Sequence, residues 1–342
     1  MAFKRELGMS ETNPILRFDG QVALVTGAGR GLGREHALLL ASRGCKVVVN
    51  DLGAAYDGLG ESTGKVADEV VSEIIAAGGE AIANYDSVEN GQQVVDAVLA
   101  AFGRLDIVVN NAGILTPEVW SELTLESWQR TIDINLTAVF SIMKAAWPIL
   151  VEQRYGRIIM TASPAMYGAG VAAYAASKAG VVGLANSIQF EAKKLKLDIK
   201  CNVLVPSAST RMTTDFGEAI NERRMQQGKK AVRPAPEAIL DRLSPDKVSA
   251  MVVWLAHNDC QSEATIHEAG AGFFAQLHMA RSAPLFATEV EKVMGAPMPE
   301  HVQQGQGILS DFAGGDMPPS GDGSMGGPSA LEQVMKHLKA DE

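Results

Sequence analysis

A tyrosine and a lysine stand four residues apart in the segment Tyr-Ala-Ala-Ser-Lys, at Tyr174 and Lys178. On a helix this spacing is about one turn, so both side chains project from the same face. A free phenol has a pKa of about 10, and a neighbouring ammonium favours the phenolate, so the pair predicts a base that works nearer neutrality. A surface tyrosine beside a solvated lysine is the alternative, and the upstream motifs decide against it.

A glycine-rich run near the N-terminus predicts a turn that binds phosphate. It directly follows an apolar stretch, Val22–Thr26, that we expect to be a strand. Glycines let the backbone bend tightly and approach a pyrophosphate, whose charge then meets the N-terminus of the next helix. The predicted dinucleotide contacts in this run are Gly27, Gly29, Arg30, Gly31, Leu32 and Gly33.

An acidic residue, Asp51, follows the next predicted strand, Lys46–Asn50. A carboxylate at this place binds ribose hydroxyls and repels the additional phosphate of NADP. Arg30 has the opposite tendency, because it could pair with that phosphate. We give Asp51 more weight, since it should lie directly against the ribose, and we predict NAD as the cofactor. A turn or helix-cap aspartate is the alternative for Asp51.

Short β-branched runs alternate with longer helical patterns along the chain. This alternation predicts an α/β fold, a doubly wound Rossmann-type parallel sheet with helices on both faces. The expected strands are Val22–Thr26, Lys46–Asn50, Ala81–Asn84, Asp106–Asn110, Gly156–Ala162 and Ile199–Leu204. The expected helices are Gly31–Arg43, Lys65–Ala77, Val88–Phe102, Leu125–Glu152 and Ala172–Lys196.

Composition sets the broad class of protein. Hydrophobic residues make up 46% and the net charge is −10, which argues against a nucleic-acid partner. Three scattered cysteines, without a CxxC pair, predict reduced thiols, a cytoplasmic location and no metal site. We see no secretory signal and no uninterrupted apolar stretch of about eighteen residues, so we expect no membrane span.

The glycine run, the segment Asn-Asn-Ala-Gly at 110–113 and the Tyr174/Lys178 pair together resemble the short-chain dehydrogenase/reductase family, over residues 18–280. Further segments are similar to one branch of it, the (3R)-hydroxyacyl-CoA dehydrogenase units of type 2 peroxisomal multifunctional enzymes, also classed as 17β-hydroxysteroid dehydrogenases of type 4. Those segments are 17–20, 48–53, 83–88, 155–161 and 268–272. In those enzymes the unit is fused to other domains, and we expect this chain to be a stand-alone, bacterial-like version.

With the resemblance we expect an N-terminal arm at 1–17, a dehydrogenase domain at 18–280 and a C-terminal extension at 281–342. Residues 207–247 should cover the substrate. The Gly/Pro/Ser-rich stretch 313–329 predicts a flexible linker.

The resemblance also implies a role for each site residue. Tyr174 would be the general base, and Lys178 would lower its pKa and hold the nicotinamide ribose. Asn135 would keep a proton-relay water near the lysine, unless it only bonds helix backbone at a bend. Asp86 would contact the adenine amino group. The remaining implied cofactor contacts are Ser87, Asn111, Ala112, Gly113 and Pro206.

The serine that binds the reacting oxygen departs from the family pattern. Thr161 occupies the usual spacing before the tyrosine, whereas Ser163 stands two residues closer to it. The flanking segments align when the intervening loop is shortened, so we predict Ser163 as the oxyanion donor and keep Thr161 as the alternative.

These features predict an NAD-dependent enzyme that interconverts a 3-hydroxyacyl-CoA and a 3-ketoacyl-CoA, with a fatty-acyl or steroid side-chain group. Five basic residues in the substrate-covering segment either form a solvated face or meet the phosphates of coenzyme A: Arg223, Arg224, Lys229, Lys230 and Arg233. The alternatives are a hydroxysteroid dehydrogenase acting on a free steroid alcohol and a catalytically silent, cofactor-binding regulator. A silent regulator would need no general base.

Relatives in this family pair through the long helix predicted after the fourth strand. Here that helix carries more apolar side chains than one sheet face needs, namely Trp128, Ile132, Leu136, Phe140, Met143 and Trp147. We therefore expect a homodimer or homotetramer; burial of all six in the monomer core is the alternative.

Overall fold

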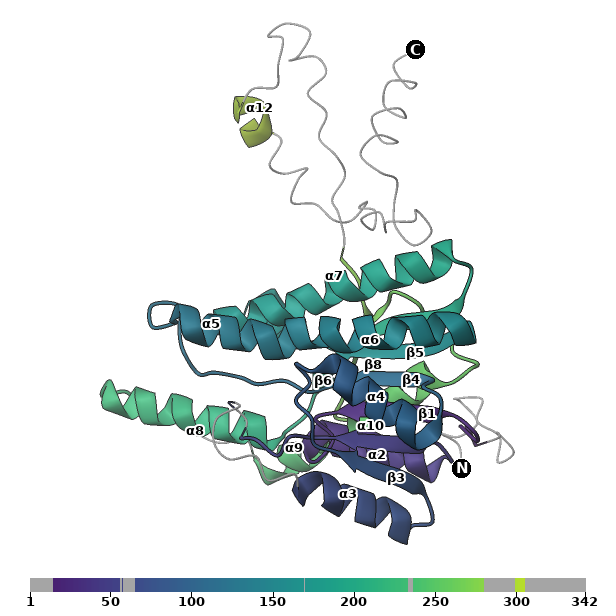
Figure 1. The fold of residues 1–342 in the computed structure, drawn as a ribbon. Helices are drawn as coiled ribbons and strands as arrows, with labels where there is room; N and C mark the ends of the chain where they lie inside the picture. Colours follow the sequence, from purple (N-terminus) through teal and green to yellow (C-terminus); the bar gives the residue numbers. More distant parts are fainter. Residues whose placement is uncertain are drawn as a thin grey trace, which may run out of the picture. The chain divides into compact units, whose positions relative to one another are not determined.

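The computed structural model describes residues 15–55, 57, 65–168, 170–232, 236–279 and 299–304. An eight-stranded sheet with the order β3-β2-β1-β4-β5-β6-β7-β8 organises the fold (Figure 1). Strands β3 to β7 are joined in parallel, which confirms the Rossmann-type sheet. The strands are β1 Val22–Thr26, β2 Lys46–Asn50, β3 Glu80–Asn84, β4 Ile107–Asn110, β5 Tyr155–Thr161, β6 Asp198–Ser207, β7 Ile266–Gly270 and β8 Phe273–Leu277.

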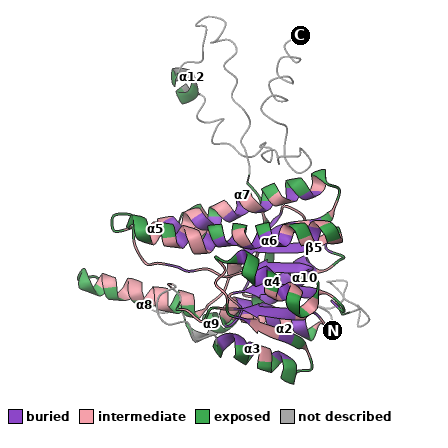
Figure 2. Ribbon diagram, in the orientation of Figure 1, coloured by how far each residue is buried: buried purple, intermediate pink, exposed green. Residues whose placement is uncertain are grey.

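Helices cover both faces of the sheet, and the central strands are therefore buried (Figure 2). On one face lie α2 Gly31–Ser42, α3 Lys65–Ala76 and α10 Asp246–Ala256. On the other lie α4 Gly91–Phe102, α6 Ala138–Gln153 and α7 Ala172–Lys194. Every residue of β1 and β4 is buried, as the near-continuous apolar sequence of a two-sided sheet requires.

The predicted long helix over Leu125–Glu152 is present, and it contains a π-helical turn in its middle. Helix α5 spans Leu125–Ile132, a π-helical turn η1 spans Asp133–Thr137, and α6 continues from Ala138 to Gln153. A π-turn contains one more residue than an α-turn, and such turns are frequent at functional sites. Residue periodicity does not reveal it, because the polypeptide stays helical throughout.

The segment between β6 and α10 forms two further helices, α8 Arg211–Gln226 and α9 Glu237–Arg242. Thr210 caps α8: its hydroxyl accepts from the Thr213 backbone N–H, and the Thr213 side chain accepts from the Thr210 N–H. None of the residues of α8 is buried. Arg233, one of the five basic residues, lies outside the described residues.

The chain divides into two compact units, residues 1–276 and 277–342. In the second unit the structure describes residues 277–279 and a short helix, α12 Pro299–Gln304. Most of the predicted N-terminal arm and the whole predicted linker at 313–329 lie outside the described residues.

Among the described helices, Leu125–Gln153 is long and apolar enough to cross a membrane by length and composition, with a mean hydropathy of 1.6. The expectation that no membrane span is present stays a prediction, because this helix contains charged residues and is not an uninterrupted apolar stretch. The evidence for a span is weak, because the core helix of a soluble protein also passes, and α6 packs here against α4.

The fold buries a histidine that the catalytic residues do not contact. His36 in α2 is fully buried; its Nδ1 lies 2.8 Å from the Ser249 hydroxyl, and its Nε2 has no partner among the described residues. Burial lowers the pKa of His36 from 6.5 to about 3.

We expect His36 to lower the free energy of unfolding as the pH is lowered. The folded pKa lies below the unfolded one, so the neutral ring's contribution is complete above pH 6.5 and is lost as the pH falls from there toward 3. The free energy of unfolding, measured by urea denaturation at several pH values, should fall less steeply with decreasing pH for His36→Gln than for wild type. The difference in slope should reach about 1.4 kcal/mol per pH unit in this window. Equal slopes for variant and wild type would contradict the assignment.

Candidate active site

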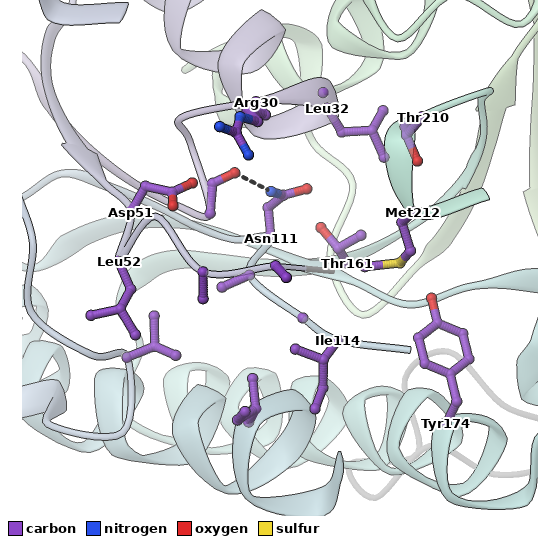
Figure 3. A pocket seen from close by; sticks show the side chains of 18 of the residues that line it. Arg30, Leu32, Asp51, Leu52, Asn111, Ile114, Thr161, Tyr174, Thr210 and Met212 are labelled. Carbon is purple, nitrogen blue, oxygen red and sulfur yellow. Dashed lines mark hydrogen bonds between the residues drawn. The ribbon is translucent and has the colours of Figure 1, made fainter. Parts of the chain in front are cut away.

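A cavity of about 810 Å³ opens at the carboxyl ends of the central strands (Figure 3). It lies where the strand order reverses between β1 and β4, the usual ligand position in open α/β sheets. Most of the residues predicted from sequence line it: Gly27, Arg30, Gly31, Leu32, Asp51, Asp86, Ser87, Asn111, Ala112, Gly113, Ser163, Tyr174, Lys178 and Pro206. Gly29, Gly33 and Asn135 do not line the cavity.

The glycine turn is built around one close backbone approach. A Cβ on Gly33 would stand 2.2 Å from the Gly27 carbonyl oxygen, so only glycine lets α2 begin this close to the end of β1. Gly27 itself has a φ of +62°. These two positions therefore shape the turn, while Gly31 and Leu32 present their surfaces to the cavity.

Asp51 is fixed by two backbone donors. Its Oδ2 accepts from the Gly29 N–H at 2.8 Å and its Oδ1 from the Gly53 N–H at 2.7 Å. The carboxylate of Asp51 is thereby held at the edge of the cavity, with further lone pairs free to accept from hydroxyl groups. Gly29 does not line the cavity but leaves room for this carboxylate, since a Cβ there would lie 2.9 Å from Oδ2 of Asp51.

A short ladder of amides positions Asp86 at the same end. Asn50 and Asn84 are paired in register on β2 and β3, and Asn50 Nδ2 donates to Asn84 Oδ1 at 2.7 Å. Asn84 Nδ2 in turn donates to Asp86 Oδ2 at 2.7 Å. Sequence reasoning missed both asparagines, although their place at two strand ends was a usable signal.

Asn111 ties the end of β4 to the glycine turn. Its side-chain Nδ2 donates to the Thr26 and Gly27 carbonyls at 3.0 and 3.2 Å. The Thr26 hydroxyl accepts from the backbone N–H of Asn111 and of Ala112, at 3.0 and 3.1 Å. The predicted Asn111 therefore holds the wall of the cavity together, and Thr26, which the sequence analysis did not single out, helps it.

Lys178 is buried at the opposite end of the cavity. Its side chain is 4% exposed, and Nζ donates to the Thr161 carbonyl at 2.8 Å. Burial lowers the pKa of Lys178 to about 8. A Cβ on Gly113 would stand 3.4 Å from this Nζ and 3.2 Å from Oδ1 of Asn135, so the glycine leaves room for both side chains.

Asn135 lies in the π-turn and is fully buried. Its Oδ1 accepts from the Ile114 N–H at 2.8 Å, and its Nδ2 donates to the Ile114 carbonyl at 2.9 Å. The side chain thus fixes the loop after β4, beside Lys178, rather than entering the cavity. The structure shows this scaffolding contact; a role in a proton relay stays a prediction.

Tyr174 and Ser163 meet at the catalytic end. Burial raises the pKa of the Tyr174 phenol, and the neighbouring Ser163 side chain partly opposes that rise. The Lys178 Nζ is 5.6 Å from the centre of the Tyr174 ring. In the ligand-free protein burial therefore outweighs the expected effect of the Lys178 ammonium, and the pKa of the phenol is raised rather than lowered.

Ser163 and Thr161 have different surroundings. Ser163 begins the short 3₁₀ helix Pro164–Tyr167, where its oxygen also accepts from the Ala165 N–H at 3.2 Å. Thr161 ends β5 and has no contact of this kind with the phenol. Ser163 therefore lies nearer the phenol's polar surroundings than the Thr161 hydroxyl does, and its role as oxyanion donor stays a prediction.

The structure adds residues from the start of the substrate-covering segment. Ala208, Thr210, Arg211, Met212 and Thr213 also line the cavity, and Figure 3 shows Met212 near Tyr174. The four basic residues of the described cluster do not line it. Among the described residues, no group of three or more His, Cys, Asp or Glu is placed to hold a metal ion.

The arrangement so assembled has a phenol, a buried ammonium and a hydroxyl at one end of a nucleotide-sized cavity. Residues 21–223 match the family described as short chain dehydrogenase. The chain therefore belongs to the short-chain dehydrogenase family, and it is an oxidoreductase enzyme.

Comparisons with individual proteins point to one branch of this family. The chain is 40% identical to mouse peroxisomal multifunctional enzyme type 2, over 91% of this chain and 40% of that protein. The full-length structure of the Drosophila melanogaster enzyme of the same name aligns with a TM-score of 0.71 at 31% identity, covering 95% of this chain and 50% of that one. The chain thus spans half or less of the length of these relatives.

A third similar protein is a short chain dehydrogenase from Mycobacterium paratuberculosis, whose structure is bound to NAD. It aligns with a TM-score of 0.65 at 27% identity and covers 75% of this chain and 98% of its own.

We expect Tyr174→Phe to remove the proton acceptor while leaving the cavity intact. Loss of general-base catalysis lowers a rate by on the order of 10²–10⁴-fold. Steady-state kcat, with cofactor affinity measured separately by titration, checks both halves of this expectation. Substantial turnover by the variant would exclude Tyr174 as the base.

Proposed function

We propose that this enzyme uses NAD to interconvert a 3-hydroxyacyl-CoA and a 3-ketoacyl-CoA. The observation that carries the proposal is one continuous cavity with a fixed carboxylate, Asp51, at one end and the Ser163/Tyr174/Lys178 group at the other. The sequence resemblance supplies the substrate class.

NAD fits the residues that are present. The turn at Gly27 and Gly33 allows close backbone approach, and Asp51 is held with free acceptor sites for ribose hydroxyls. A similar protein of the same family is bound to NAD. Arg30 is exposed at the start of α2, so it does not neutralise Asp51 through a contact that the structure shows.

The mechanism follows from the catalytic end. When bound, NAD supplies the hydride acceptor. Ser163 donates a hydrogen bond to the substrate oxygen, and Tyr174 accepts the hydroxyl proton as the alcohol becomes a ketone. Lys178, held by the Thr161 carbonyl, carries its positive charge below a pKa of about 8. In the reverse direction Tyr174 returns the proton.

The cofactor proposal predicts a higher kcat/KM with NAD than with NADP. Asp51→Asn should narrow this difference, because it removes the charge that repels the additional phosphate while keeping one acceptor oxygen. Parallel kinetics with both cofactors test it. A wild-type preference for NADP would mean that Arg30 outweighs Asp51.

The acyl-CoA part rests on the basic side chains along α8. Arg211, at the first turn, lines the cavity, and Arg224 stands thirteen residues on, about 20 Å along the helix. In coenzyme A the pantetheine arm separates the phosphates from the thioester. Basic side chains at the end of α8 that is distant from the cavity are therefore placed to bind these phosphates.

The five basic residues are not equivalent, however. Arg223 pairs with Glu122 and donates to the Pro117 carbonyl at 3.2 Å, so it joins α8 to the loop after β4. Arg224 donates to the Lys230 carbonyl at 2.9 Å. Lys229 and Lys230 are exposed, and Lys229 donates to the exposed Gln227 side chain at 2.9 Å, a contact at the surface that a phosphate could replace.

We expect the double variant Lys229→Gln/Lys230→Gln to raise KM for a 3-hydroxyacyl-CoA by roughly 5- to 30-fold, given about 0.5–1 kcal/mol for each of the two exposed charge contacts. The kcat should stay constant, because remote phosphates bind equally in the ground and transition states. The same acyl group on N-acetylcysteamine, which lacks the nucleotide, should be unaffected. Lys194→Gln/Lys196→Gln, two exposed lysines at the end of α7, is the charge-matched control.

The outcomes separate two failures. Absence of NAD-dependent turnover of any 3-hydroxyacyl-CoA by the wild type would refute the proposed function. Equal KM values for variant and wild type would refute only the phosphate contact. Turnover of free steroid alcohols in preference to the thioesters would favour the alternative function, a hydroxysteroid dehydrogenase. The ion pair between Arg223 and Glu122 supports that alternative, because it takes up one of the charges that would otherwise meet coenzyme A.

We also propose a homodimer formed through the helix that follows β4. Phe140 is 53% exposed, whereas Met143 on the same helix is 2% exposed, so the six apolar residues are not all in the monomer core. An exposed phenylalanine on a long helix suits a contact with a second copy.

A further inference from the structure

One buried polar atom at the cavity lacks a partner. Four buried side-chain N or O atoms have no hydrogen-bond partner in the described part of the chain: His36 Nε2, Asn110 Nδ2, Arg157 Nε and Thr161 Oγ1. Of these four residues, only Thr161 lines the cavity. Its side chain is 6% exposed, and Figure 3 shows it directed from the end of β5 into the space bordered by Asn111, Met212 and Tyr174.

The rest of Thr161 is already engaged. Its carbonyl accepts from Lys178 Nζ at 2.8 Å, and its backbone is paired with Leu204 of β6. These contacts fix the residue in place. A buried hydroxyl without a hydrogen bond is costly, and such groups are rare in folded proteins unless a ligand or water satisfies them. The hydroxyl therefore indicates a polar group of the molecule that occupies the cavity.

The position of Thr161 along the cavity shows which half of the bound cofactor its hydroxyl would contact. Thr161 lies beside Lys178 and two residues before Ser163, at the catalytic end, whereas Asp51 and Asp86 lie toward the other end. The hydride must be transferred near Tyr174, so the nicotinamide half of the cofactor belongs there. Adenosine and its ribose belong near Asp51.

Resting on the proposed use of NAD, we propose that the Thr161 hydroxyl hydrogen-bonds the nicotinamide nucleoside and positions it for hydride transfer. The recognised chemistry is a carboxamide or a ribose hydroxyl, both of which can pair with a hydroxyl group. This assigns Thr161 a task different from that of Ser163, whose side chain neighbours the Tyr174 phenol.

Binding measurements with cofactor fragments test the assignment without turnover. Thr161→Val keeps the shape of the side chain and removes the hydroxyl. Its dissociation constant for NAD, from calorimetry, should rise by about 3- to 10-fold, the value of one neutral hydrogen bond. Its affinity for ADP, which lacks the nicotinamide nucleoside, should be unchanged. Thr161→Ser should restore NAD affinity.

ADP-ribose separates the two recognised groups. It keeps the second ribose and lacks the ring, so weaker binding of ADP-ribose by Thr161→Val identifies the ribose hydroxyl. Unchanged ADP-ribose binding together with weaker NAD binding identifies the carboxamide. Both outcomes support the proposal.

Thermal unfolding and Ser163→Ala complete the design. The ligand-free Thr161→Val protein should be no less stable than wild type, since it buries no unpaired hydroxyl. Ser163→Ala should behave in the opposite way, with NAD affinity kept and kcat reduced on the order of 10²–10³-fold. If Thr161→Val is not recovered folded, Thr161→Ala takes its place in the same titrations.

Equal affinity of wild type and variant for NAD, or an equal loss for NAD and ADP, would overturn the proposal. Failure of the wild-type protein to bind NAD at all would refute the proposed function instead.

Discussion

The buried ammonium of Lys178 is the interaction on which the rest of the site depends. Its bond to the Thr161 carbonyl ties α7 to the end of β5, and this places Tyr174, one helical turn away, over the cavity. The site then has to tolerate a charge taken out of water, which is why the pKa of Lys178 falls to about 8. Gly113 leaves the space that this ammonium occupies, and Asn135 fixes the loop that carries Gly113.

The two ends of the cavity are built on different principles. At the Asp51 end, backbone N–H groups and an amide ladder hold carboxylates rigidly in contact with solvent. At the Tyr174 end, burial raises the pKa of the phenol, and a neighbouring hydroxyl opposes that rise. One end is suited to binding polar groups, whereas the other makes the protonation state of one side chain sensitive to what lies next to it.

Features set by local spacing could be predicted from the sequence. Tyr174 and Lys178 share a helix, and Gly27, Gly33 and Asp51 follow strands whose apolar runs are clear, so their places were predictable. Thr26, Asn84 and the pairing of Arg223 with Glu122 were not, because they depend on segments brought together only by the fold. The π-turn was hidden for another reason, since adding one residue to a helix leaves its apolar pattern almost unchanged. The choice between Ser163 and Thr161 as oxyanion donor stays a prediction, since the sequence spacing favours Thr161 and the proximity of Ser163 to the phenol favours Ser163.

The π-turn also changes the direction in which the helix residues on its two sides face, and each side has a fixed contact. Asn135 must face Ile114, while α6 is fixed at its other side by α4, where a Cβ on Gly91 would come within 2.4 Å of the Ser141 backbone. Each residue of an α-helix advances the chain by about 100° around its axis. Deleting one residue from Asp133–Thr137 would rotate one of these contacts out of place by that angle. The additional residue therefore lets a single helix satisfy two neighbours whose required orientations differ.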